Sequence, residues 1–178
     1  MVRRFCTANA RPVLVAAVLY AVGVAIGAAL TPGSVQRGAD TAAGAAAVLL
    51  LLQHNALVVL ALSLGGLTLG LSTLLVLVSN GATVGLAVTV ALRSTSATDV
   101  LLAIAPHGVL EIPATLLAGA AGLKVMQSVY ARTCGRPTPS MAAALSDAVV
   151  LTSLALCLVV LAAPLEVYVS LHLPAGAA

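Results

Sequence analysis

The sequence predicts an all-α protein: a polytopic transmembrane helix bundle with about five crossings and with re-entrant or broken half-helices. Of its 178 residues, 61% are hydrophobic and 7% are charged, whereas soluble domains are about 45–50% apolar and about 25% charged. So few charges cannot keep the surface of a soluble protein of this size, roughly 7,900 Å², in water. The apolar residues also fall into runs near the ~20 residues that a crossing needs. We expect a single transmembrane domain over residues 1–178, with a short cytoplasmic tail at 1–12.

The first predicted span, Val13–Leu30, ends at a turn with the sequence Thr31-Pro32-Gly33. It is longer than the ~7–15 apolar residues of a secretory signal, so we expect a retained helix. The next apolar stretch, Thr41–Val78, is too long for one crossing and is interrupted by Gln53-His54-Asn55. Segments of ~10–14 apolar residues are more often re-entrant than spanning. We therefore expect a half-helix over Ala42–Leu52 that dips into the membrane and returns at the polar triplet.

The second full crossing is then Ala56–Val78, followed by a turn at Ser79-Asn80-Gly81, since Asn-Gly is a strong turn dipeptide. Two short apolar segments come next, Ala82–Leu92 and Asp99–Ala105. The number of crossings between residues 41 and 92 stays open, because these short segments can be grouped in more than one way.

Proline and glycine residues predict helix breaks in the next part of the chain. Pro106 lacks an N–H donor and disfavours helix in the residue before it, and Gly108 lowers helical stability further. A new helix is expected over Pro106 to about Tyr130, with a second missing hydrogen bond at Pro113. The last span is expected from Leu145 to about Val169.

The basic residues predict the orientation of the bundle. With a cytoplasmic N terminus and five crossings, only Arg37 and Arg93 lie outside, which satisfies the positive-inside rule. The cytoplasmic set is Arg3, Arg4, Arg11, Lys124, Arg132 and Arg136. The chain is thus expected to be a multi-pass cell-membrane protein in contact with the lipid bilayer, with its C terminus outside. Residues expected at the membrane interface are Asp147, Glu166, Tyr20, Tyr130 and Tyr168.

Small residues spaced four apart predict close helix contacts. The pairs are Gly23 and Gly27, Gly66 and Gly70, and Gly81 and Gly85. Packing within one chain and formation of a homo-oligomer are both compatible with this pattern.

A polar centre is predicted on the helix that follows the proline break. His107 and Glu111 lie four residues apart and therefore share a face, which Thr115 continues. An ionised carboxylate near mid-membrane costs ~2.5–3.5 kcal/mol. That cost is offset if the carboxyl group is protonated, if it pairs with a protonated His107, or if it accepts hydrogen bonds from other polar groups. The candidate donors are Asn55, His54 and Asn80.

Three roles for this centre remain open at the level of sequence: a polar pin that fixes the helices, a site for a proton, ion or small solute, and a surface that holds a partner. Catalysis has little support, because neither H-E-x-x-H nor G-x-S-x-G is present. The three cysteines, Cys6, Cys134 and Cys157, lack C-x-x-C spacing. We expect no enzymatic activity, no metal site and no cofactor. Nucleic acid is not an expected partner, since eight scattered basic residues accompany only one Phe, three Tyr and no Trp.

One motif resembles a known family. The segment Pro106-His107-Gly108-Val109-Leu110-Glu111-Ile112-Pro113-Ala114 is similar to the P-H-G-x-x-E-x-P-A signature of the stage II sporulation protein M family of integral membrane proteins. The features that precede it at similar spacing are Asn55, the glycines Gly65, Gly66 and Gly70, and Asn80-Gly81-x-x-x-Gly85. The resemblance covers roughly Val13 to Leu165.

The resemblance implies a non-enzymatic role. The named member of the family in spore-forming bacteria is a polytopic membrane component of the machinery that remodels peptidoglycan during engulfment, where it acts with two wall hydrolases. We therefore expect a scaffold or assembly factor for a cell-envelope complex. The loops of this chain are too short to form an extracytoplasmic domain, so membrane or envelope protein partners must contact helices or short loops. The alternative is a small proton-coupled transporter or channel that uses His107 and Glu111.

Overall fold

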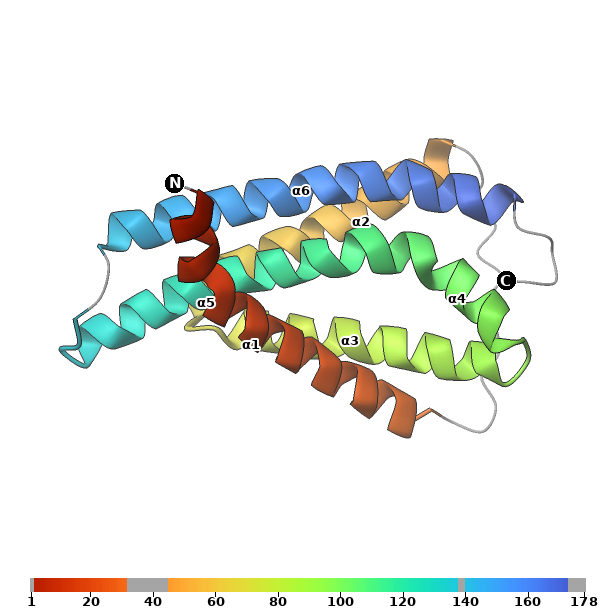
Figure 1. Cartoon of the computed structure of the whole chain (residues 1–178), viewed down its shortest axis with the longest axis horizontal. Coiled ribbons are helices and arrows are strands. Elements are labelled where there is room, and N and C mark those ends of the chain that lie inside the picture. Colours follow the sequence, from red (N-terminus) through yellow and green to blue (C-terminus); the bar gives the residue numbers. More distant parts are fainter. Residues whose placement is uncertain (1, 32–44, 138–139, 173–178) are drawn as a thin grey trace.

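The computed structural model describes residues 2–31, 45–137 and 140–172, and these form a bundle of helices (Figure 1). Within these ranges there are six α-helices and no β-strand, so the predicted all-α fold is confirmed. The helices are α1 (Val2–Ala29), α2 (Ala45–Ser63), α3 (Leu71–Leu92), α4 (Ala97–Pro106), α5 (Ile112–Thr133) and α6 (Met141–His172). Two short helices of other types join them: η1, a 3-10 helix over Leu64–Thr68, and η2, a π-helix over His107–Glu111.

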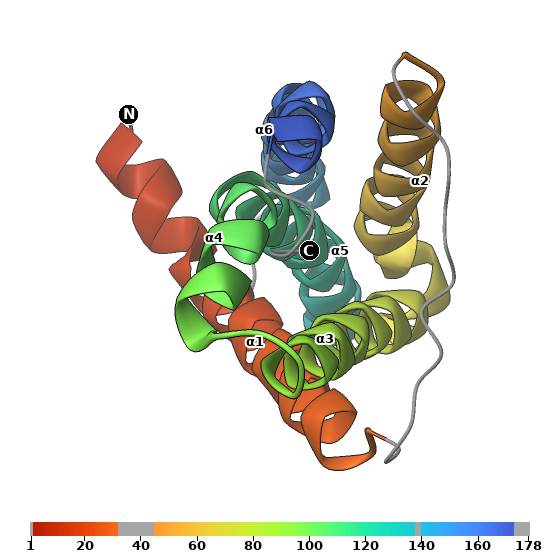
Figure 2. The ribbon, with the colours of Figure 1, turned by 90° about the vertical axis from the view of Figure 1, so that its right-hand side faces the viewer.

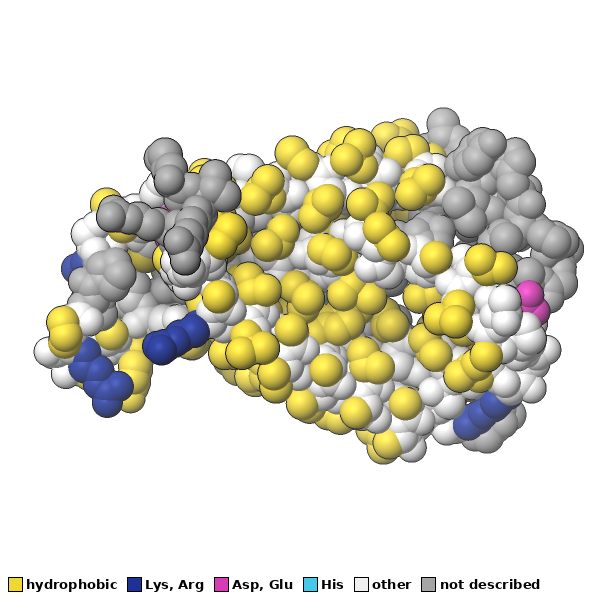
Figure 3. Space-filling view, viewed as in Figure 1, with side chains coloured by type: hydrophobic (Ala, Val, Ile, Leu, Met, Phe, Trp, Pro, Cys, Tyr) yellow, Lys and Arg dark blue, Asp and Glu magenta, His cyan; other side chains and the backbone are white. Residues whose placement is uncertain are grey.

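Five helical segments are long and apolar enough to cross a membrane, in agreement with the predicted number of crossings. They are Phe5–Ala29, Val48–Thr68, Leu71–Leu92, Gly108–Thr133 and Met141–Leu165. The chain is thus a multi-pass membrane protein. Hydrophobic side chains cover the middle of one face, and Lys and Arg side chains lie near its two ends (Figure 3).

The prediction of a re-entrant half-helix at Ala42–Leu52 is wrong. Residues 42–44 lie outside the described part of the chain, and from Ala45 onwards α2 runs unbroken through Gln53-His54-Asn55 to Ser63. A continuous helix satisfies its own backbone groups in the membrane. Polar side chains therefore do not require the chain to turn where they occur, provided that they find partners.

The chain reverses direction later, so the predicted single crossing over Ala56–Val78 is also wrong. After η1, Leu69 and Gly70 take positive φ angles of 51° and 87°, and the Gly70 N–H donates to the Gly65 carbonyl oxygen at 2.7 Å. Glycine adopts this left-handed conformation readily, whereas a leucine does so only when its surroundings demand it. The turn thus follows the glycine cluster instead of the polar triplet.

Asn80 and Gly81 lie inside α3, so the predicted turn and helix break at this dipeptide are wrong. Gly81 is a packing position: a Cβ atom there would overlap the carbonyl oxygen of Tyr20 in α1. The predicted short segment Ala82–Leu92 is the second half of this same helix.

Glycines on both helices bring α1 and α3 into backbone contact. A Cβ atom at Gly23 or Gly27 would overlap the carbonyl oxygen of Val78 or Ala82, and one at Gly85 would overlap that of Val24. Close approach of this kind is typical of small-xxx-small helix pairs in membranes. Gly66 and Gly70 face α5 instead, where added side-chain atoms would overlap Val125 and Met126. In this structure all of these glycines pack against helices of the same chain.

The break near Pro106 differs in form from the prediction. Pro106 is the last residue of α4 and does not begin a new helix. The π-helical turn of η2 follows, and Pro113 stands in the first turn of α5. Because Pro113 has no N–H to donate to the preceding turn, it is compatible with this widened stretch. The axis of α4 bends away from that of α5 at this point (Figure 1).

Helix α5 occupies the centre of the bundle, with α1, α2, α3 and α6 around it (Figure 2). Its small residues allow this position, since Ala114, Ala118, Ala120 and Ala121 are all fully buried. Half of the most apolar stretch in the Gly108–Thr133 span is buried, against 17% in Val48–Thr68 and in Leu71–Leu92. Helices α2 and α3 therefore present most of their side chains to the surroundings.

Candidate functional site

The candidate site centres on Glu111, the last residue of the π turn. Its side chain is buried, with 6% of its surface exposed. The Nδ2 amide of Asn55 in α2 donates a hydrogen bond to Glu111 Oε1 across 56 residues of sequence. A hydrogen bond inside the bundle is costly to break, because the polar groups that it joins would be left without partners away from water. This contact therefore ties α2 to the start of α5.

Two other buried side chains lie close to Glu111. Tyr20 of α1, which is also buried, interacts electrostatically with the Glu111 carboxylate. The prediction that Tyr20 anchors at headgroup level is wrong, whereas Tyr130 is exposed near the end of α5 and the side chain of Tyr168 is outside the described set. Thr115, one turn after Glu111, is buried as well. Glu111 is thus surrounded by residues from α1, α2 and α5.

A cavity of about 180 Å³ lies beside the carboxylate, between α2, α3, α5 and α6. It is large enough to hold water molecules. Its polar lining consists of His54, Asn55, Asn80, Thr83, Glu111 and Thr115. The structure thus brings together four of the five residues of the predicted polar centre, along with Thr115.

The fifth residue, His107, lies in the π turn, and its side chain falls outside the described residues, as does that of Pro106. Gly108 is half-buried in the same turn, and an added Cβ atom there would meet nothing within 4 Å. A wider turn lets the chain bend while its backbone groups stay largely satisfied within the helix. The pairing of His107 with Glu111 therefore stays a prediction.

Sequence reasoning missed a second polar cluster. Lys124 of α5 forms an ion pair with Asp147 of α6 and donates to Asn9 Oδ1 of α1 at 2.6 Å. Asn9 is only 3% exposed, and its Nδ2 donates to the Phe5 carbonyl oxygen at 2.9 Å. Asp147 therefore binds a neighbouring helix as well as lying near a helix end. A usable signal was present, since Lys124 and Asp147 are nine and six residues from the α5–α6 connection, on helices that run antiparallel.

These contacts have two chemical consequences. A buried carboxylate that accepts from an amide can hold two helices in register, and one that borders a polar cavity can also exchange a proton with water there. Both capabilities belong to the same residue, Glu111.

Comparison with known families gives one match, to Stage II sporulation protein M, over residues 15–171. This match confirms the resemblance that the P-H-G-x-x-E-x-P-A segment indicates. No curated protein and no solved structure matches the chain.

Proposed function

Because the chain belongs to the stage II sporulation protein M family, we propose that it is a non-enzymatic membrane scaffold or assembly factor for a cell-envelope complex. In this role it would hold membrane or envelope protein partners against a fixed arrangement of helices. The proposal requires a rigid bundle with helix surface left over for a partner.

The hydrogen bond between Asn55 and Glu111 is the observation that supports this role most directly. It fixes α2, which with α3 is among the least buried helices of the bundle, to the most buried helix, α5. Leaving the carboxylate without a partner in the membrane would be costly, so the contact favours one arrangement of the two helices. Outside this contact α2 exposes large apolar side chains, among them Leu49, Leu50 and Leu57. Helix α2 is thus both held in place and available to a partner.

The proposal includes an orientation. Lys124 and Arg132 lie in the C-terminal half of α5, at the same end of the bundle as the N-terminal half of α1 (Figure 1). Arg93 follows α3 at the opposite end. The positive-inside rule then puts the N terminus in the cytoplasm and the C terminus outside.

Site-specific photocrosslinking in native membranes tests the scaffold role. A photoreactive residue would replace Leu57 of α2, which is 59% exposed. The matched control replaces Leu161 of α6, which is 61% exposed. We expect a discrete protein adduct from position 57 and lipid adducts alone from position 161. Lipid adducts alone from position 57, and from Leu75 on α3, would contradict the proposal.

A second function, proton-coupled transport, is favoured by one observation, the polar cavity that contains Glu111. Its test is the decay of a pH gradient in liposomes that hold folded protein. Transport predicts a faster decay with the wild type than with Glu111→Gln, and an unchanged decay with Asp99→Asn at the start of α4. Equal decay for the wild type and Glu111→Gln would exclude this mechanism.

Water access separates the two functions at lower cost. His54 lines the cavity without being buried, so His54→Cys can be made in a chain whose native cysteines are replaced by alanine. Rapid reaction with a membrane-impermeant thiol reagent would favour transport. A thiol that reacts only with permeant reagents would favour a closed structural centre.

A further inference from the structure

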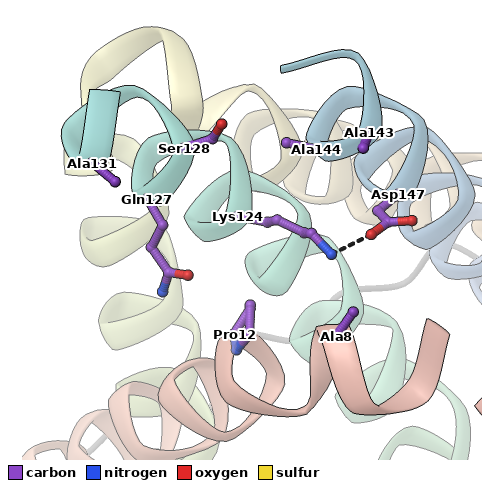
Figure 4. A pocket seen from close by; sticks show the side chains of 9 residues that line it. All are labelled: Ala8, Pro12, Lys124, Gln127, Ser128, Ala131, Ala143, Ala144 and Asp147. Atoms are coloured by element: carbon purple, nitrogen blue, oxygen red, sulfur yellow. Dashed lines mark hydrogen bonds and ion pairs between the residues drawn. The ribbon is translucent and has the colours of Figure 1, made fainter. Parts of the chain in front are cut away.

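A second pocket, of about 510 Å³, lies between α1, α5 and α6 (Figure 4). It shares no lining residue with the cavity at Glu111. Ligand pockets in proteins are commonly about 300–1,000 Å³. Its walls are small apolar residues from all three helices, including Ala8, Pro12 and Ala144. Its polar lining consists of Lys124, Gln127, Ser128 and Asp147.

The pocket reaches the level of lipid headgroups. Along α5 it extends from Lys124 to Ala131, about 10 Å at 1.5 Å per residue, and Ala131 is two residues from the end of the span at Thr133. The headgroup regions add about 5–8 Å to each side of the hydrocarbon core. Its deep end is therefore in hydrocarbon and its shallow end is among headgroups.

The polar groups of the pocket are only partly satisfied within the described chain. Asp147 binds Lys124 through Oδ2, while its Oδ1 makes no hydrogen bond to any described residue. The Lys124 ammonium group has three N–H donors, and its partners in the described ranges are Asn9 and Asp147. Ser128 also lines the pocket, but its Oγ is enclosed by protein and has no hydrogen-bond partner among the described residues. The groups that remain for a ligand are therefore Asp147 Oδ1 and the third N–H of Lys124.

The charges of the lining select the ligand. Figure 4 shows the Lys124 and Asp147 side chains meeting at one side of the pocket, so a cationic and an anionic group stand next to each other. A purely anionic headgroup would be attracted by Lys124 and repelled by Asp147, whereas a zwitterionic one can satisfy both. No aromatic residue is among the described residues that line the pocket, and quaternary ammonium groups are typically held by aromatic faces. A primary ammonium group, with three donors for Asp147 Oδ1, fits better.

We propose that this pocket binds the headgroup of a phospholipid that carries a phosphate and a primary ammonium group. The phosphate lies against the Lys124 ammonium group, and the lipid ammonium group donates to Asp147 Oδ1. The acyl chains leave along the apolar outer surface of the bundle. The inference does not depend on the proposed scaffold role.

Native mass spectrometry of the full chain, purified from vesicles of equal parts phosphatidylethanolamine, phosphatidylcholine and phosphatidylglycerol, tests the proposal. We expect the wild type to retain phosphatidylethanolamine about tenfold over phosphatidylcholine, the size of one charge-assisted hydrogen bond. Asp147→Asn leaves Lys124 as the only charge, so it should shift the preference to phosphatidylglycerol. The matched control Asp99→Asn, far from the pocket, should leave the wild-type preference unchanged.

Equal retention of the three lipids by the wild type would overturn the proposal. So would an unchanged lipid ratio in folded Asp147→Asn, because an ion pair that only pins helices would alter stability and leave lipid choice alone. If Asp147→Asn does not fold, Ala143→Leu replaces it, since Ala143 is exposed and lines the pocket, and a larger side chain there occupies the headgroup space. This variant should lower phosphatidylethanolamine retention, and retention equal to wild type would contradict the proposal.

Discussion

Two polar centres lie at Glu111 and Lys124, 13 residues apart along η2 and α5, about 20 Å at the rise of an α-helix. Lys124 has a partner of opposite charge on α6 and an amide partner on α1. Glu111 has an amide partner on α2 and a polar cavity beside it. The comparison shows two ways to keep an ionisable group inside a membrane: charge pairing near the interface, and hydrogen bonds with polar space at depth.

The two centres also tie different helices together. Glu111 connects α5 to α2, whereas Lys124 connects α5 to α1 and α6. Between them α5 carries the buried small residues over which the hairpin of α2 and α3 packs. Close packing in the middle and polar contacts at both ends therefore fix α5 at the centre of the bundle.

Removing the close packing between the centres should have the largest effect. In Gly122→Ala the new methyl group overlaps the Leu62 carbonyl oxygen and crowds Thr73 Oγ1, so we expect a loss of about 3 kcal/mol or more of unfolding free energy. Titration with SDS in mixed micelles, followed by circular dichroism, measures it. Gly108→Ala is the matched control, because its methyl group meets no atom within 4 Å. Equal stability of the two variants would show that α5 is less tightly packed than described.

Breaking the charge-paired centre should come next. Lys124→Met leaves the Asp147 carboxylate without its cation, and removal of one partner from a buried pair costs about 3–5 kcal/mol. Since the Asp147 side chain is 27% exposed, we expect about 2 kcal/mol in the same titration. The double variant Lys124→Met/Asp147→Leu should recover most of this loss. If the double variant is as unstable as Lys124→Met, the loss of unfolding free energy comes from the missing ion pair and not from the unpaired Asp147 carboxylate.

The change Glu111→Gln should have the smallest effect of the three. The glutamine side chain keeps the shape and one carbonyl acceptor for Asn55, and loses only the strengthening that charge gives a hydrogen bond. We expect a loss of about 1 kcal/mol by the same measurement. A clear gain in stability would mean that the ionised carboxylate destabilises the bundle. A destabilising carboxylate at this position would favour the transport function.

The two centres also differ in how far sequence could reveal them. Glu111 stands alone in an apolar run, and the cost of a carboxylate at that depth predicts a buried position near Asn55, His54 and Asn80. The distances of Lys124 and Asp147 from the α5–α6 connection make contact between them possible, but each residue could also reach the interface alone, so the pairing itself depends on how α5 packs against α6. Asn9 carried no signal at all, because an asparagine near the start of a helix is unremarkable.

The fold likewise has features that the sequence predicts and features that it does not. The number of crossings follows from the length of the apolar runs, which the thickness of the membrane imposes. The positions of the turns were wrong at Gln53-His54-Asn55 and at Asn80-Gly81, because tertiary contacts outweighed the local preferences: Asn55 has a partner in Glu111, and Gly81 packs on Tyr20. The observed turn depends on a positive φ angle at Leu69. Leucine rarely adopts this conformation, so the sequence does not predict a turn there.

A double-mutant cycle between Asn55 and Glu111 tests most directly whether this contact clamps α2 to α5. The unfolding free energies of the wild type, Asn55→Ala, Glu111→Ala and the double variant would be measured by SDS titration in mixed micelles. The proposed clamp predicts a coupling free energy of about 1.5 kcal/mol, typical of residues in direct contact. Losses that add within about 0.5 kcal/mol would contradict it, because the two side chains would then act independently.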